Sequence, residues 1–410
     1  MKATAKANAI VFTQGGPTPV INASWVGVLE GLKGSSRVGR VMGAMNGVDG
    51  IIKQNLVDLT AQSASGLEQC VLAPASALYT TRHKPSDEEC AKVLDVFRRQ
   101  GIRFVFGIGG NDTSETLHIV NEAAKAANYE LRLFHVPKTI DCDLMENDHT
   151  PGYGSAARFV ARAFMGVDLD NQCFGGIYLG VCMGRHAGFL AAASAICRQD
   201  EDDGPHLVYV PERPFEMEKF LADVYSIYDR TGRCVIAVSE GIETPDHKPV
   251  LELLQGEQGK DSHGNVQLSG SGGLSDGLMA RIKDHVAKLR PKEKTRARAD
   301  TLGYIQRSYP DQSEVDRKEA REVGRFAAKM ALSGDIDGSV TIKRDEGKRY
   351  KVRYELVDLA LVAGKTRRMP SNFINAEGNN VTQAFVDWAR PLVGPLSPRP
   401  KLKMKMMPPK

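Results

Sequence analysis

Short apolar runs that end in glycine or polar turn residues recur along this chain. Five of them are AIVFT before QGGPTP, FVFGI before GGNDT, RLFHV before PKTIDCD, GIYLGVC before MGRHAG and CVIAVSE before GIETPD. Buried strands of a parallel sheet are apolar in this near-continuous way. Stretches with helical periodicity, such as 87–99 and 113–128, lie between most of the runs. Strands that alternate with helices predict an α/β fold with mainly parallel sheets and right-handed crossovers.

The length of 410 residues predicts at least two lobes, because a single core rarely grows beyond about 250–300 residues. Ligands of parallel sheets bind outside the carboxyl ends of the strands, so we expect the site in a cleft between the lobes. The expected division is a first lobe at 1–150 with 308–335 packing back on it, a second lobe at 151–307, a C-terminal extension at 336–395 that contains one hairpin, and a basic, disordered tail at 396–410.

Composition narrows the partners and the compartment. The chain is 42% hydrophobic and 25% charged with a net charge of +4, which is ordinary for a soluble protein. No basic patch is interleaved with aromatic residues, so we expect no nucleic-acid partner. Seven cysteines without a C-x-x-C pair favour a reducing compartment over a zinc site or a disulfide framework. The N-terminal apolar run is too short for a signal peptide or a membrane span, and we expect a cytoplasmic protein.

The GGNDT turn at 109–113 follows a predicted strand and opens a predicted helix. Glycines let backbone N–H groups approach an anion closely, and the helix N-terminus attracts negative charge. Thr113 is the expected N-cap. The turn is therefore a candidate phosphate site, although a well-capped helix without a ligand has the same pattern.

The PKTIDCD segment places Lys138, Thr139, Asp141 and Asp143 at the end of another strand. Two Asp residues two positions apart in an extended segment face the same side. One carboxylate can accept a proton from a hydroxyl, the other can hold Mg²⁺, and the lysine can neutralise a phosphate. A solvated loop with an incidental ion pair is the alternative.

The remaining strand-end turns carry complementary chemistry. They are GGPTPVIN, YTTRHKPS with Arg82, MGRHAG with Arg185, SEG with Glu240, and LGYIQRS with Arg307. Arginine suits a bidentate grip on phosphate, and a carboxylate accepts hydrogen bonds from sugar hydroxyls. Together the turns predict a glycine-lined cleft, rich in acids and cations, for phosphoryl transfer to a phosphorylated sugar.

These motifs, in this order over roughly 8–335, resemble those of the phosphofructokinase family. GGNDT is similar to its GGDGS or GGDDS loop, PKTIDCD to its T-I-D-N-D segment and MGRHAG to its M-G-R segment. The resemblance implies the phosphofructokinase fold of two Rossmann-like lobes, a first lobe for the phosphoryl donor and a second for the sugar phosphate. It also implies Mg²⁺-dependent phosphorylation of the 1-hydroxyl of fructose 6-phosphate.

The resemblance carries roles over residue by residue. Asp141 is expected to be the base, with Thr139, Asp143 and Lys138 as further catalytic residues. The expected donor-binding residues are Gly16, Arg82, Gly110, Asn111, Asp112, Thr113 and Lys138, of which Asp112 and Asn111 are also the expected metal ligands. The expected sugar-phosphate residues are Thr139, Asp141, Met183, Gly184, Arg185, Glu240, Arg298, Tyr304 and Arg307. Arg298 is expected to reach the site of a neighbouring subunit, so we expect a homodimer or homotetramer.

Two residues bear on the donor. ATP-dependent members of the family usually have glycine at the positions of Asp112 and Lys138, whereas pyrophosphate-dependent members have Asp and Lys. An Asp side chain intrudes on and repels the α-phosphate of ATP. The resemblance thus implies a reversible enzyme of glycolysis and gluconeogenesis that uses pyrophosphate and releases phosphate and fructose 1,6-bisphosphate. An ATP-dependent sugar-phosphate or nucleoside kinase is the alternative, and a non-catalytic regulatory paralogue is a third interpretation.

Three positions depart from the family pattern. Asn111 stands where many members have a metal-binding Asp, Gly176 where bacterial ATP enzymes have a cross-subunit Arg, and Tyr304 where a His is common. The sequence leaves open whether larger acceptors such as sedoheptulose 7-phosphate are used, the physiological direction, the exact oligomer and the role of the extension at 336–395.

Overall fold

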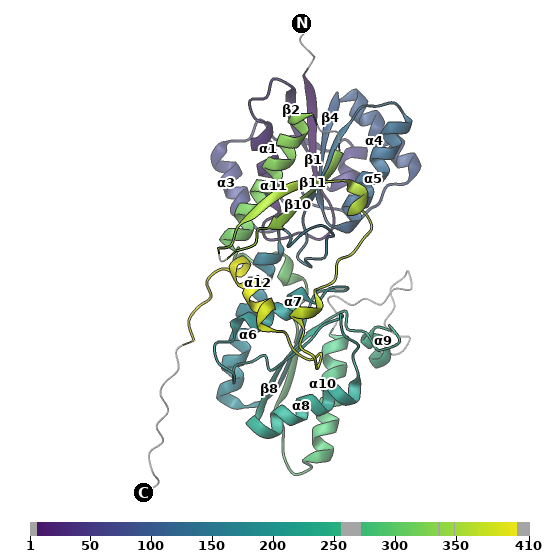
Figure 1. Cartoon of the computed structure of the whole chain (residues 1–410). Coiled ribbons are helices and arrows are strands. Elements are labelled where there is room, and N and C mark those ends of the chain that lie inside the picture. Colours follow the sequence, from purple (N-terminus) through teal and green to yellow (C-terminus); the bar gives the residue numbers. More distant parts are fainter. Residues whose placement is uncertain (1–5, 256–271, 335–336, 348, 400–410) are drawn as a thin grey trace.

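The computed structural model describes residues 6–255, 272–334, 337–347 and 349–399. Two α/β lobes are stacked one on the other, with β1 in one and β8 in the other (Figure 1). The stretch 257–265, interpreted above as a surface loop, lies outside the described residues, as does the end of the chain from 400 onwards.

The first lobe is built on a seven-stranded sheet with the order β11-β10-β5-β4-β1-β2-β3. Its inner strands are parallel, and the two antiparallel pairs, β10–β11 and β2–β3, lie at its edges. The bounds of its elements are β1 Ala7–Thr13, α1 Ile21–Leu32, β2 Val38–Ala44, α2 Gly47–Ile52, β3 Leu56–Asp58, α3 Ala64–Leu72, α4 Asp87–Arg99, β4 Ile102–Gly109, α5 Asn111–Ala126, β5 Arg132–Pro137, α11 Glu314–Ser333, β10 Asp337–Arg344, β11 Val352–Val357 and η4 Leu359–Leu361.

The second lobe has a four-stranded parallel sheet with the order β7-β8-β6-β9. The bounds of its elements are α6 Tyr153–Phe174, β6 Gly176–Cys182, α7 Phe189–Ala193, η1 Ser194–Cys197, β7 Leu207–Tyr209, α8 Met217–Thr231, β8 Arg233–Ser239, α9 Val250–Gln255, α10 Gly273–Leu289, β9 Ala297–Thr301, η3 Gly303–Arg307, η5 Ser371–Phe373 and α12 Gln383–Val393. The predicted α/β class with mainly parallel sheets is confirmed, and all five apolar runs are strands.

The chain passes between the lobes three times in its described part, at 138–152, 302–313 and 358–370. After the second crossing, α11 packs tightly against α1. A Cβ at Gly27 would lie 2.0 Å from the Arg321 carbonyl oxygen, and one at Gly324 would lie 2.1 Å from that of Ser24. Only glycine permits this approach. After the third crossing, Phe373 and Phe385 join the core of the second lobe that contains Phe164.

The predicted hairpin in the C-terminal extension is present. Strands β10 and β11 pair in an antiparallel register between Ser339–Val357 and Arg344–Val352, and β10 also pairs in parallel with β5. The hairpin therefore extends the first lobe's sheet beyond β5.

Helix α4 has the predicted bounds, and Ser86 caps it with a capping box completed by Glu89. The expected N-cap at Thr113 is wrong. Helix α5 begins at Asn111, Gly110 occupies the N-cap position, and no side chain caps the helix. Thr113 is buried in the first turn, with its Oγ1 3.5 Å from the carbonyl oxygen of Gln14. The N-terminus of α5 is thus without a side-chain cap.

The beginning of the expected disordered tail is held in place. Arg399 is buried and forms a close ion pair with Asp168 of α6, which is also bound by Arg233 at 2.6 Å. The sequence suggested a solvated segment because proline and lysine dominate the composition of the tail, but Arg399 compensates a fully buried carboxylate.

We expect Arg399→Met to destabilise the second lobe by about 2–4 kcal/mol, since removing one partner leaves buried charge poorly compensated. Arg233 remains as a partner, which keeps the cost below that of an isolated charge. In thermal unfolding, Arg399→Met should have a lower melting temperature than Arg390→Met, a matched change at an exposed arginine of α12. Equal melting temperatures would contradict the structural role.

Candidate active site

Turns from both lobes meet at the crossings of the chain. Gly15 has a positive φ of 81° after β1, and a Cβ at the next residue, Gly16, would lie 2.9 Å from Nε of Arg307. The Nζ of Lys138 donates a hydrogen bond of 2.6 Å to the carbonyl oxygen of Gly16. Lys138 follows β5 and Arg307 ends η3, so the β1–α1 turn contacts cations from both lobes.

The segment after β5 is a turn rather than an extended strand. Cys142 has a φ of 60°, so the prediction of an extended segment that turns Asp141 and Asp143 to the same side is wrong. The backbone N–H of Asp141 donates to Oγ1 of Thr139 at 3.1 Å. The Asp141 Oδ1 atom is buried and has no hydrogen-bond partner among the described residues. Buried carboxylate oxygens are normally bonded, so this atom indicates a position that a ligand group fills.

The charges of this cluster are strongly coupled. Burial raises the pKa of Asp141, and the nearby Arg307 and Lys138 oppose that rise. Burial and the neighbouring Asp141 carboxylate raise the pKa of Asp143. Burial, followed by the charge of Arg307, lowers the pKa of Lys138 to about 7. Two acids and two cations lie close together in a partly buried region, where charge interactions are stronger than in bulk water.

Asn111 and Asp143 suit a Mg²⁺ ion bound together with phosphate. The Nδ2 of Asn111 donates to Oδ2 of Asp143 at 3.1 Å, while the buried Oδ1 of Asn111 has no hydrogen-bond partner in the described part of the chain. Mg²⁺ is commonly held by one or two protein oxygens with substrate phosphates and water completing the shell. A cage of three or more Asp, Glu, His or Cys side chains is absent from the described residues, which this mode of binding does not require.

The other expected metal ligand, Asp112, has a different environment. Its side chain is 68% exposed, and Oδ1 forms an ion pair of 3.0 Å with Nζ of Lys84, which also binds Glu115 at 2.7 Å. Asp112 stands in the first turn of α5 beside Asn111. The geometry favours Asp143 over Asp112 as the carboxylate next to Asn111.

The remaining donor residues surround Lys138. A Cβ at Gly110 would lie 3.6 Å from the Lys138 carbonyl oxygen. The Arg82 side chain is exposed, and its charge lowers the pKa of both Lys138 and Arg307. Of the donor-binding set, Gly16, Arg82 and Gly110 are therefore brought to the same place, whereas Thr113 is buried behind the turn.

Three of the expected sugar-phosphate residues, Met183, Gly184 and Arg185, lie in one turn after β6. Hydrogen bonds join this turn to Glu240, a fourth expected residue, and to Gln306. The N–H of Met183 donates to Oε1 of Gln306 at 3.3 Å, and that of Gly184 donates to Oε1 of Glu240 at 3.4 Å. Arg185 is the next residue and is exposed. In η3, the guanidinium carbon of Arg307 lies 5.0 Å from the ring centroid of Tyr304. These residues form the second lobe's side of the site.

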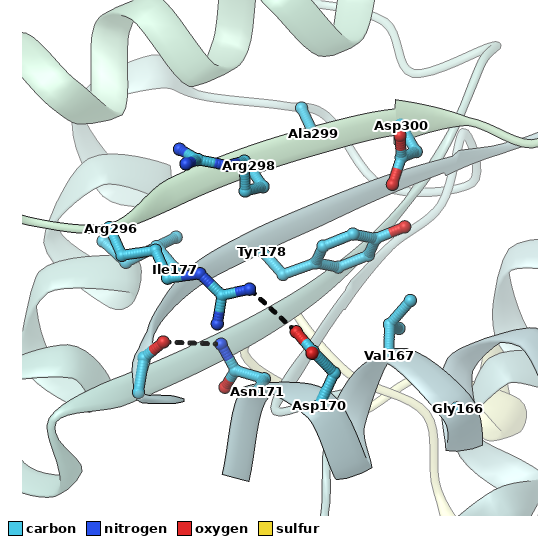
Figure 2. Close-up of a pocket in the computed structure, with 11 residues that line it drawn as sticks. Gly166, Val167, Asp170, Asn171, Ile177, Tyr178, Arg296, Arg298, Ala299 and Asp300 are labelled. Atoms are coloured by element: carbon cyan, nitrogen blue, oxygen red, sulfur yellow. Dashed lines mark hydrogen bonds and ion pairs between the residues drawn. The ribbon is translucent and has the colours of Figure 1, made fainter. Parts of the chain in front are cut away.

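Arg298 is not part of this cluster. It lies on the edge strand β9, opposite Tyr178 of β6, which places it roughly 16 Å along the strands from Met183. Figure 2 shows it over a pocket of about 350 Å³ in which Arg296 pairs with Asp170 at 2.9 Å. Its exposed side chain does not face its own chain's catalytic turn.

Sequence reasoning missed several residues of the site. Lys84 lies two residues after Arg82, and that cationic spacing was a usable signal. Gln306 carries no signal that distinguishes it from an ordinary polar residue of a helical turn, although its side chain accepts a bond from Met183.

Two α/β lobes with carboxylates and cations gathered at strand ends are typical of the class of phosphoryl-transfer enzymes. Comparison with known proteins makes this specific: the chain belongs to the phosphofructokinase family, whose model, "Phosphofructokinase", matches residues 8–331. The recognition made from the motifs is thereby confirmed, and so is the assignment as a phosphotransferase.

Relatives along nearly the whole chain have one printed function. The chain is 50% identical over 390 residues to the pyrophosphate–fructose 6-phosphate 1-phosphotransferase of Rhodospirillum rubrum, covering 95% of each chain. It is 33% identical to the enzyme of that name from Halomonas elongata, covering 95% of this chain and 92% of that one. The solved pyrophosphate-dependent phosphofructokinase of Nitrosospira multiformis is 27% identical, with a TM-score of 0.84 over 97% of this chain and 95% of that one.

None of the helices in the described ranges is both long and apolar enough to span a bilayer.

Proposed function

We propose that this protein transfers a phosphoryl group reversibly from pyrophosphate to the 1-hydroxyl of fructose 6-phosphate, yielding fructose 1,6-bisphosphate and phosphate. The observation that carries the proposal is the Asp141 carboxylate, whose buried Oδ1 atom has no partner among the described residues and which lies close to the charges of Lys138 and Arg307. The relatives named above support pyrophosphate over ATP as the donor.

In this reaction Asp141 accepts the proton of the attacking hydroxyl. Thr139 orients Asp141, because the Oγ1 atom of Thr139 accepts a hydrogen bond from the backbone N–H of Asp141. Lys138 and Arg307 neutralise charge on the transferring and leaving phosphates, since fixed cations in a dry site stabilise the transition state. Asn111 and Asp143 would hold Mg²⁺, which would supply further charge neutralisation.

Donor choice follows from Lys138 and Asp112. The Lys138 ammonium lies against the Gly16 carbonyl, in the space next to the glycine turn where a nucleotide would place its inner phosphates. Asp112 adds an exposed carboxylate in the first turn of α5, next to Asn111. Pyrophosphate is smaller than a nucleotide, so it avoids the steric cost of Lys138 and the electrostatic cost of Asp112.

The sugar phosphate is held by Arg185, Glu240, Tyr304 and Arg307 in the same chain. Arg298 faces away from them, so we infer that it serves the site of a neighbouring copy in a homodimer or homotetramer. Gly176 lacks a side chain for that task, and a Cβ there would lie 2.3 Å from the Arg296 carbonyl oxygen, which excludes an arginine at this position without backbone movement.

The test is Mg²⁺-dependent formation of fructose 1,6-bisphosphate with pyrophosphate or ATP supplied separately. We expect turnover with pyrophosphate and little with ATP. Turnover with ATP alone would overturn the donor assignment and leave the acceptor assignment standing. A wild-type rate no higher than that of Asp141→Ala would favour a non-catalytic protein.

The lowered pKa of Lys138 predicts that kcat/KM for pyrophosphate decreases at basic pH. The free protein's Lys138 has a pKa lowered to about 7, so the charged form that binds pyrophosphate is depleted as the pH rises above 7. We expect kcat/KM for pyrophosphate to fall as pH rises through this range. Lys138→Met should lack this decrease, and the ionisation of pyrophosphate affects both proteins alike. Identical profiles for the two proteins would contradict the assignment.

A further inference from the structure

A short segment of the C-terminal extension lies against the catalytic turn. This segment, 366–369, belongs to the third crossing between the lobes. Thr366 forms an antiparallel bridge with Leu144, and the backbone N–H of Arg367 donates to the carbonyl oxygen of Asp143 at 2.7 Å. The extension is thus bonded to the main chain of one of the two catalytic acids.

The side chain of Arg367 binds the other end of the same turn. Its Nη1 donates to the carbonyl oxygens of Asn147 and Asp148, the latter at 2.6 Å, and its guanidinium carbon lies 5.2 Å from the ring centroid of Phe189. One residue therefore contacts both ends of the turn 143–148 and an aromatic ring of the second lobe.

The turn needs such support because its backbone is strained. Cys142 and Glu146, on either side of Asp143, have φ values of 60° and 62°. Residues other than glycine keep this conformation only where surrounding contacts over-determine it. Besides the bonds from Arg367, the backbone N–H of Asp148 donates to the carbonyl oxygen of Ile342 at 2.8 Å, so the C-terminal hairpin also holds the turn.

The same segment is joined to the sugar-phosphate turn through Glu212. The Oε1 of this partly buried carboxylate accepts from the N–H of Met369 at 3.0 Å and from the N–H of Gly188 at 3.0 Å. Gly188 is the N-cap of α7 and lies three residues after Arg185. The 366–369 segment thereby connects the turn that carries Asp141 and Asp143 with the turn that carries Arg185.

We propose that Arg367 is a positioning residue for phosphoryl transfer. It fixes the conformation of the turn 143–148. Through Met369 and Glu212, its segment also fixes the position of this turn relative to the turn that carries Arg185. The inference rests on the proposed function for its catalytic consequence. It assigns to the C-terminal extension a role in the active site, although no residue of the extension needs to touch substrate.

The first experiment compares the wild type with Arg367→Met, Arg367→Lys and the control Arg353→Met. Arg353 is an exposed arginine of β11 that binds Asp345 and Glu355 on the surface. We expect Arg367→Met to lower kcat about ten- to a hundredfold, as small misplacements of reacting groups do, with KM changed much less. Arg367→Lys should recover part of the loss, because an ammonium can still donate to both carbonyls.

Hydrogen exchange of the amides at 143–148, measured on the same proteins, tests the geometry without using activity. Exchange should be faster in Arg367→Met than in Arg353→Met. If exchange and kcat match those of the control, or if exchange rises while kcat does not fall, the inference is overturned. If the wild type transfers no phosphoryl group, the proposed function fails, and exchange alone decides whether Arg367 sets the turn.

The link through Glu212 is tested by two variants, one that removes the side-chain acceptor and one that is isosteric with glutamate. Glu212→Ala removes the acceptor of both N–H groups, whereas Glu212→Gln keeps a carbonyl oxygen in the same place. We expect about a tenfold higher KM for fructose 6-phosphate in the alanine variant, the cost of roughly one to two hydrogen bonds, and near-normal behaviour in the glutamine variant. Equal KM values for the two variants would remove Glu212 from the argument.

Discussion

Asp141→Asn is expected to lower kcat by about 10³- to 10⁴-fold, near the upper range of general-base contributions. Asparagine keeps the shape of the side chain and the bond from the backbone N–H to Thr139, but it cannot accept a proton from the sugar hydroxyl. Because the Oδ1 atom of Asp141 is buried and the side chain lies near Lys138, Arg307 and Asp143, water has little access to this atom as a substitute base.

Steady-state kinetics with saturating pyrophosphate and fructose 6-phosphate measure this effect. The affinity for pyrophosphate should stay within a fewfold of wild type, which separates loss of the base from loss of the fold. Asp387→Asn, at an exposed carboxylate of α12, is the control for general effects of removing a charge. A loss of less than tenfold in Asp141→Asn would mean that another group accepts the proton.

The second large effect concerns the donor. Lys138→Gly should lower kcat/KM for pyrophosphate by about 10²- to 10³-fold, the cost of removing one well-placed stabilising group from a dry site. Lys138 is 2% exposed and bonded to the Gly16 carbonyl, so its ammonium occupies a fixed position. Its removal also opens space beside the glycine turn.

The double variant Asp112→Gly/Lys138→Gly should gain ATP-dependent turnover that the wild type lacks. It removes the Lys138 side chain that obstructs a nucleotide and the Asp112 charge that repels it. Initial rates with each donor on the two single variants and the double variant assign the effect. Asp112→Gly alone also removes one of the two ion pairs of Lys84 and leaves the one with Glu115. Failure of the double variant to use ATP would show that other residues exclude the nucleotide.

The parts of the site that follow strands were predictable, because apolar runs locate strands and parallel strands end at one edge of a sheet. That reasoning located the turns of Gly16, Lys138, Arg185 and Glu240 without a structure. It failed for Thr113, since local capping preference gives no account of an N-cap three residues earlier, at Gly110.

Other features depend on distances that a sequence pattern does not contain. The position of Arg298 follows from the register of β9 against β6, which no local motif encodes. The left-handed conformation of Cys142 places two carboxylates differently from an extended segment. Arg367 binds main-chain carbonyls 220 and 219 residues away, and backbone partners leave no trace in residue identities.

The order of strands in the first lobe has a consequence for synthesis on the ribosome. Strand β5 is complete at Pro137, but its partner β10 begins only at Asp337. Until some 200 residues later, the emerging sheet has an open edge of unpaired amides and carbonyls at β5, the kind of edge that recruits other strands. The helix that covers α1 is equally late. When only the early part of the first lobe has emerged from the ribosome, we therefore expect the nascent chain to depend on chaperones or on rapid translation. The reason is that such long-range strand pairing forms slowly.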